Sequence, residues 1–72
     1  MAMLERTTAG YLYRDPAGFI VYETGTTVPT DAVAGYAKGA SFIDTDVAGG
    51  TSGLYVNVGT TASCNFDLVT DA

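Results

Sequence analysis

The sequence has no histidine and only one cysteine, Cys64. A single cysteine cannot form a disulfide within the chain, and without histidine there is no zinc-finger ligand spacing. A cysteine nucleophile would also lack an obvious base to activate it, so we expect Cys64 to be a buried structural residue. These absences argue against an enzyme, and we expect no catalytic residue, no metal site and no cofactor.

Basic residues are scarce as well. Arg6, Arg14 and Lys38 are the only ones, against eight Asp and Glu, which gives a formal net charge of -5. Because binding to phosphate depends mainly on Lys and Arg, nucleic acid is not an expected partner. No run approaches the roughly 18 apolar residues of a membrane-spanning helix, and the N-terminus lacks the apolar region of a signal peptide. We therefore expect no membrane partner either.

Charged residues of both signs make up only 15% of the chain, whereas ordinary soluble domains have about 25%. A core formed by 72 residues gives marginal stability, and small domains usually need a disulfide, a metal or a partner. Since the first two are missing, we expect association with other subunits or with a larger surface. The alternative is a threonine-rich β protein that stays soluble on its net charge.

Apolar residues recur at every second position in three segments, which is the period of a half-buried strand. Alternation places Phe42 and Ile43 on opposite faces, and likewise Tyr55 and Val56. The segments are joined by glycine-containing, hairpin-sized connections over residues 48–53 and 59–63, so we predict an antiparallel meander with an apolar face. Its predicted strands are Phe42–Val47, Leu54–Val58 and Cys64–Val69.

A hairpin is predicted earlier in the chain, over Gly10–Glu23. Its turn, Asp15-Pro16-Ala17-Gly18, has the residues that a type I turn favours at the first, second and fourth positions. We expect hairpin and meander to form a small all-β, antiparallel barrel or sandwich, in one domain over residues 9–72. Residues 1–8 are interpreted as an extended N-terminal arm, either disordered or ordered against a partner.

The connection between hairpin and meander is less regular. Thr24–Asp31 is interpreted as a polar loop. After it, Thr30 or Asp31 could cap one helical turn over residues 32–34, or the chain could cross in an extended conformation; the sequence leaves both open.

Two further motifs favour ordinary structural roles. Asp44 and Asp46 lie two apart and would project from one face of a strand, but they lack the other positions of a calcium loop, so a solvated strand face is the preferred interpretation. Gly35–Gly39 is too short for a phosphate-binding loop. We interpret it as a turn with Lys38 in solvent, or with Lys38 meeting an acidic group of a partner subunit.

Four segments together, about half of the chain, carry a family resemblance. They are Gly35-Tyr36-Ala37-Lys38-Gly39, Phe42-Ile43-Asp44-Thr45-Asp46, Gly53-Leu54-Tyr55-Val56-Asn57-Val58-Gly59-Thr60 and Ser63-Cys64-Asn65-Phe66. With these segments the chain resembles small virion proteins of tailed bacteriophages, namely head-decoration (cement) or head-fibre proteins. The resemblance implies no enzymatic residues.

The resemblance implies a structural protein on the outer surface of the capsid that binds the major capsid protein and forms a homotrimer. A head-fibre or knob module that binds a host receptor or glycan is the alternative. From the arm, the hairpin tyrosines and the single lysine, we expect a partner-binding set that contacts the capsid or a neighbouring subunit: Met3, Leu4, Arg6, Tyr11, Tyr13 and Lys38.

Overall fold

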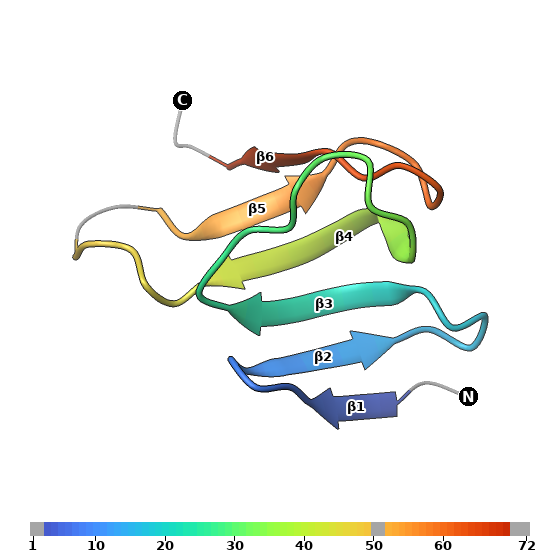
Figure 1. Cartoon of the computed structure of the whole chain (residues 1–72), viewed down its shortest axis with the longest axis horizontal. Helices are drawn as coiled ribbons and strands as arrows, with labels where there is room; N and C mark the ends of the chain where they lie inside the picture. The colour runs from blue at the N-terminus through green and yellow to red at the C-terminus, as the bar shows by residue number, and fades with distance from the viewer. Residues whose placement is uncertain (1–2, 50–51, 70–72) are drawn as a thin grey trace.

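The structure is a computed structural model that describes residues 3–49 and 52–69. The described part is all-β, as predicted. Six strands form one sheet in the order in which they occur along the chain (Figure 1). The strands are β1 (Met3–Arg6), β2 (Tyr11–Arg14), β3 (Ile20–Gly25), β4 (Tyr36–Asp44), β5 (Leu54–Asn57) and β6 (Phe66–Leu68).

The sheet is mixed rather than wholly antiparallel. Strands β3 and β4 pair in parallel, with Glu23 beside Phe42, whereas the other neighbouring pairs are antiparallel. The sheet runs from edge β1 to edge β6, so the predicted closed antiparallel barrel is not formed. The pairing of β3 with β4 is parallel because the connection over residues 26–35 carries the chain back to the end of the sheet where β3 begins. A parallel pair requires such a crossover.

The crossover has no helix over residues 26–35, so of the two alternatives that the sequence leaves open, the helical turn over residues 32–34 is not formed. Its backbone pairs with the connection between β5 and β6: Ala32 donates to the carbonyl of Cys64, and Cys64 donates to that of Val33, at 2.9 and 3.0 Å. Gly35 donates to Thr61 at 2.9 Å. These bonds satisfy backbone groups that a helix would otherwise have satisfied internally.

The segment predicted as part of an arm is an edge strand. Strand β1 pairs with β2, with Met3 opposite Arg14 and Arg6 opposite Tyr11. An ion pair supports this pairing, because Arg14 Nε lies 2.8 Å from Glu5 Oε2. Residues 3–6 therefore belong to the sheet, whereas residues 1 and 2 lie outside the described part.

The hairpin turn forms as predicted. Gly18 donates to the carbonyl of Asp15 at 2.9 Å, and the Asp15 carboxylate accepts from the backbone N–H groups of Ala17 and Phe19 at 3.0 Å each. Gly18 has a φ of 93°, a conformation that glycine adopts without a steric penalty. The pairing of β2 with β3 shifts register after Tyr13.

The meander also forms, with different boundaries. Strand β4 begins at Tyr36, so Lys38 lies in a strand rather than in a turn, and Gly39 with a φ of 76° interrupts its regularity. The same strand ends at Asp44. Asp46 therefore lies in the following turn, where its N–H donates to Asp44 Oδ1 at 2.9 Å, and the expectation that both aspartates project from one strand face is wrong.

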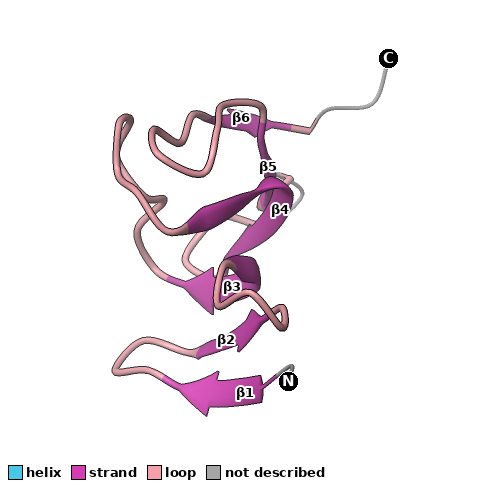
Figure 2. Ribbon diagram, turned by 90° about the vertical axis from the view of Figure 1, so that its right-hand side faces the viewer, coloured by secondary structure: helices cyan, strands magenta, loops and turns pink. Residues whose placement is uncertain are grey.

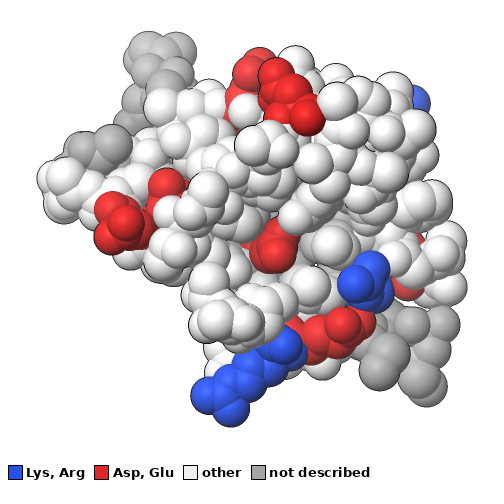
Figure 3. Space-filling model, in the orientation of Figure 1, with Lys and Arg blue, Asp and Glu red and all other residues white. Residues whose placement is uncertain are grey.

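The core lies between one face of the sheet and the crossover, and we call this side the covered face. In Figure 2 the crossover lies to one side of the sheet. The buried cluster consists of Tyr36, Ala40, Phe42, Cys64 and Phe66. Cys64 is 1% exposed and its Sγ lies 3.2 Å from the carbonyl oxygen of Thr30, so its predicted burial is confirmed. Figure 3 views the covered face, where acidic groups are scattered among a largely uncharged surface.

Candidate interaction surface

The opposite face of the sheet is built by pairs of residues that lie side by side on neighbouring strands. Leu4 is opposite Tyr13, and Tyr13 is opposite Tyr22. Tyr22 lies beside Ser41, which is opposite Val56. Val56 is in turn opposite Asp67 on β6. Because paired residues project from the same face of a sheet, these six form a continuous row across β1 to β6.

A second row runs alongside the first. Arg6 is opposite Tyr11, and Ile43 is opposite Leu54. Each lies two positions along its strand from a member of the first row, so it projects from the same face. Thr24 lies beside Ile43 and completes this row on β3. We call the two rows together the open face: Leu4, Arg6, Tyr11, Tyr13, Tyr22, Thr24, Ser41, Ile43, Leu54, Val56 and Asp67.

The open face exposes large apolar groups. Leu4 is 64% exposed, Tyr11 48%, and Tyr13 and Tyr22 41% each, while Ile43 and Val56 are half-buried. By contrast, residues that project from the covered face are buried. Phe42, next to Ile43 in the sequence, is only 2% exposed. A contiguous apolar patch on a small protein commonly marks a protein–protein contact, and tyrosine suits such contacts because its ring is apolar and its hydroxyl can form hydrogen bonds.

The structure brings together four of the six residues predicted to bind a partner. Leu4, Arg6, Tyr11 and Tyr13 lie on the open face. Met3 is opposite Arg14 in the backbone register, but its side chain is outside the described part. Lys38 is exposed near the start of β4 and belongs to neither row. A role of these residues in binding stays a prediction.

Sequence reasoning missed the half of the open face that lies beyond β2. The expected contact residues did not include Tyr22, Ile43, Leu54 and Val56. The alternation of apolar residues already placed Ile43 and Phe42 on opposite faces of a strand. The missing information was which of two apolar faces the crossover covers. The fold supplies it, because Phe42 belongs to the buried core cluster on the covered face.

Two features are absent from the part of the chain that the structure describes. Within residues 3–49 and 52–69, no three His, Cys, Asp or Glu side chains lie together as metal ligands would. The same ranges contain no helix with the length and apolar character to cross a membrane. The open face carries one basic side chain, Arg6 on β1, and one acidic side chain, Asp67 on β6, among apolar and hydroxyl groups. Such a surface can bury apolar area and form a few hydrogen bonds.

The chain matches no family model, no curated protein and no solved structure.

Proposed function

We propose that the protein is a structural virion protein, a capsid decoration (cement) protein that binds the outer surface of the major capsid protein lattice of a tailed bacteriophage. The observation that carries the proposal is the open face, an apolar and tyrosine-rich side of the sheet that the chain leaves exposed. The sequence resemblance to small phage head proteins supports the choice of partner. No catalysis, cofactor or nucleic acid is part of this role.

The mechanism is burial of apolar surface across a junction between capsid subunits. Apolar area removed from water contributes roughly 25 cal/mol per Å², and this contribution offsets the outward pressure of packaged DNA on the shell. Leu4, Tyr11 and Tyr13 supply apolar contact from the edge half of the open face. Arg6 supplies the one positive charge there, which can pair with an acidic group of the capsid protein.

The proposal includes a homotrimer. Lys38 lies apart from the open face, and we assign it to a contact with an acidic group on a neighbouring copy. In the assembled state a partner surface packs on the open face as a second layer. A low content of charged residues fits a subunit whose surfaces are partly covered.

The proposal is tested by adding the full-length protein to purified capsids that lack it and sedimenting the mixture. We expect saturable binding, with a copy number that matches the symmetry of the shell, and a rise in the temperature at which the capsids open. Protein that stays monomeric and remains in the supernatant at all concentrations would contradict the proposal.

A head-fibre or knob module is the second candidate, because the same exposed tyrosines could bind a receptor or glycan on a host cell. The two candidates predict different binding partners. A fibre module should bind host cells or isolated surface glycans and leave capsid stability unchanged, whereas a cement protein should do the opposite.

A further inference from the structure

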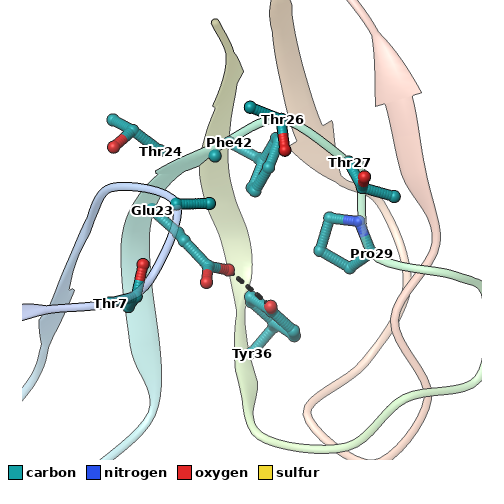
Figure 4. A pocket seen from close by; sticks show the side chains of 10 residues that line it. Thr7, Glu23, Thr24, Thr26, Thr27, Pro29, Tyr36 and Phe42 are labelled. Carbon is teal, nitrogen blue, oxygen red and sulfur yellow. Dashed lines mark hydrogen bonds between the residues drawn. The ribbon is translucent and has the colours of Figure 1, made fainter. Parts of the chain in front are cut away.

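A pocket of about 260 Å³ lies on the covered face, away from the open face. It forms where the β1–β2 connection, β3, the start of the crossover and β4 meet (Figure 4). Its lining includes Thr7, Glu23, Thr26, Thr27, Tyr36 and Phe42. Neither the sequence motifs nor the proposed capsid role accounts for it.

One hydrogen bond orients the acidic group of the pocket. The Tyr36 hydroxyl donates to Glu23 Oε1, across the parallel pair of β3 and β4. Burial, and then the hydrogen bond to Glu23, raise the pKa of Tyr36 well above its usual range. The phenol therefore keeps its proton and remains the donor of this hydrogen bond. In the described part of the chain this is the one hydrogen bond of the Glu23 side chain, which leaves the second carboxylate oxygen able to accept another.

The rest of the lining is rich in oxygen and contains no positive charge. Thr7 from one connection, and Thr26 and Thr27 from the other, line the pocket together with Glu23 (Figure 4). No Lys or Arg is among the lining residues, so an anion would meet repulsion without a compensating partner. Pro29 and the ring of Phe42 add an apolar part to the wall.

We propose that this pocket binds a primary alkylammonium group, the chemistry of a lysine side chain. Its three N–H donors match the free oxygen of Glu23 and the threonine hydroxyls of the lining. The methylene chain matches the wall formed by Pro29 and Phe42. The net charge of -5 favours the approach of a cation over that of an anion. The inference does not depend on the capsid role.

The test is a titration of the full-length protein with n-butylammonium chloride at constant ionic strength, followed by amide chemical shifts in NMR. Shift changes should be confined to residues 7–9, 23–29, 36 and 42, and 1-butanol at the same concentrations should not produce them. Equal responses to the amine and the alcohol would overturn the proposal, as would the absence of any response to the amine.

A charge-neutral variant gives the second arm. Glu23→Gln keeps an oxygen that can accept from Tyr36 but removes the charge, and should weaken amine binding by about tenfold or more. Asp46→Asn removes the same charge from an exposed turn outside the pocket and should bind as the unchanged protein does. Equal affinity of the Glu23 and Asp46 variants would overturn the proposal. The spectrum of each variant reports directly whether it is folded.

A third arm separates a protein lysine from a free amine. Nα-acetyl-lysine amide carries the ammonium at the end of a side chain attached to a backbone, and its Nε-acetylated form lacks the charge. Binding of the first but not the second assigns the pocket to a lysine of a partner protein. Binding of butylammonium without Nα-acetyl-lysine amide assigns it to a free amine, and binding of the acetylated form as well would contradict recognition of the ammonium.

Discussion

Tyr13 on β2 lies directly opposite Tyr22 on β3, and both side chains are 41% exposed. The two rings lie within the row that crosses the sheet from Leu4 to Asp67. A cross-strand aromatic pair stabilises a sheet by roughly 0.2–1 kcal/mol. Two exposed aromatic rings contribute more when a partner covers them, because binding free energy is concentrated in a few such groups.

The first prediction follows from this pair. The double variant Tyr13→Ser with Tyr22→Ser should bind purified capsids at least tenfold more weakly than the unchanged protein. Its free energy of unfolding should fall by only about 1 kcal/mol. Co-sedimentation measures the first quantity and urea unfolding the second. Val33→Ser is the matched control, since Val33 is 40% exposed but lies on the crossover; binding that falls equally in this control would contradict the assignment.

The second prediction concerns Phe66, the centre of the core. Its ring contacts Tyr36 edge to face, with centroids 5.1 Å apart, and Phe42 with centroids 6.2 Å apart. Phe66→Ala should lower the free energy of unfolding by about 3 to 5 kcal/mol, because it removes the buried ring and leaves a cavity. A loss of that size is most of the stability of a small domain, so the variant should be largely unfolded by circular dichroism. Leu68→Ala, at a position 42% exposed, should stay folded.

The third prediction concerns Asn57, a buried amide that is 2% exposed. Its Nδ2 donates to the carbonyl of Ala37 at 2.9 Å. Its Oδ1 accepts from the backbone N–H groups of Gly59 and Asn65, each also at 2.9 Å. The side chain thus joins β4, the end of β5 and the start of β6.

Asn57→Ala would leave these three backbone groups without partners. Since an unsatisfied buried polar group costs about 1–3 kcal/mol, we expect a loss of at least about 3 kcal/mol, measured by urea unfolding. Asn65→Ala is the control, because the Asn65 side chain is exposed and its backbone N–H is retained. A similar, small decrease in the free energy of unfolding of both variants would show that the hydrogen bonds of the Asn57 side chain do not stabilise the fold.

The fourth prediction concerns pH. Burial, followed by the hydrogen bond to Glu23, raises the pKa of Tyr36 in the folded state. The folded protein therefore holds this proton more tightly than the unfolded chain does. Its contribution to stability is present below the unfolded pKa of about 10 and is lost as pH rises above that value.

The free energy of unfolding should consequently fall between about pH 9.5 and 11, and the fall should be smaller in Tyr36→Phe. Urea unfolding of both proteins over this range measures the difference. The comparison is made only if Tyr36→Phe has the same circular dichroism spectrum at pH 7. Identical slopes with pH would show that the phenol titrates alike in the folded and unfolded chains.

Local turn chemistry was readable from the sequence, whereas the pairing of distant strands was not. Asp15, Pro16 and Gly18 define the hairpin turn through their own backbone preferences and a side chain–backbone bond, so the hairpin was predicted within a residue or two. The parallel pairing of β3 with β4 depends on a crossover without helical periodicity. The hairpin-sized connections in the rest of the chain led us to predict antiparallel pairing for every strand. No local sequence signal indicated that β3 and β4 pair in parallel.

The candidate surface and the pocket were predictable to different degrees. Tyr11 and Tyr13 were expected at a contact because a lone hairpin with exposed tyrosines needs a packing partner. Tyr22 was not singled out, since its position on the open face follows from its register with Tyr13. Glu23 and Tyr36 could not be paired from sequence, because their contact depends on the parallel pairing that the sequence did not indicate.

The most direct test of the proposed capsid role is electron microscopy of tailed-phage heads to which the protein has been added. The account predicts density for the six-stranded sheet at three-fold or quasi-three-fold positions on the outside of the shell, at full occupancy, with Tyr13 and Tyr22 facing a capsid subunit or a neighbouring copy. Heads without this density, or density that protrudes with both tyrosines in solvent, would contradict it.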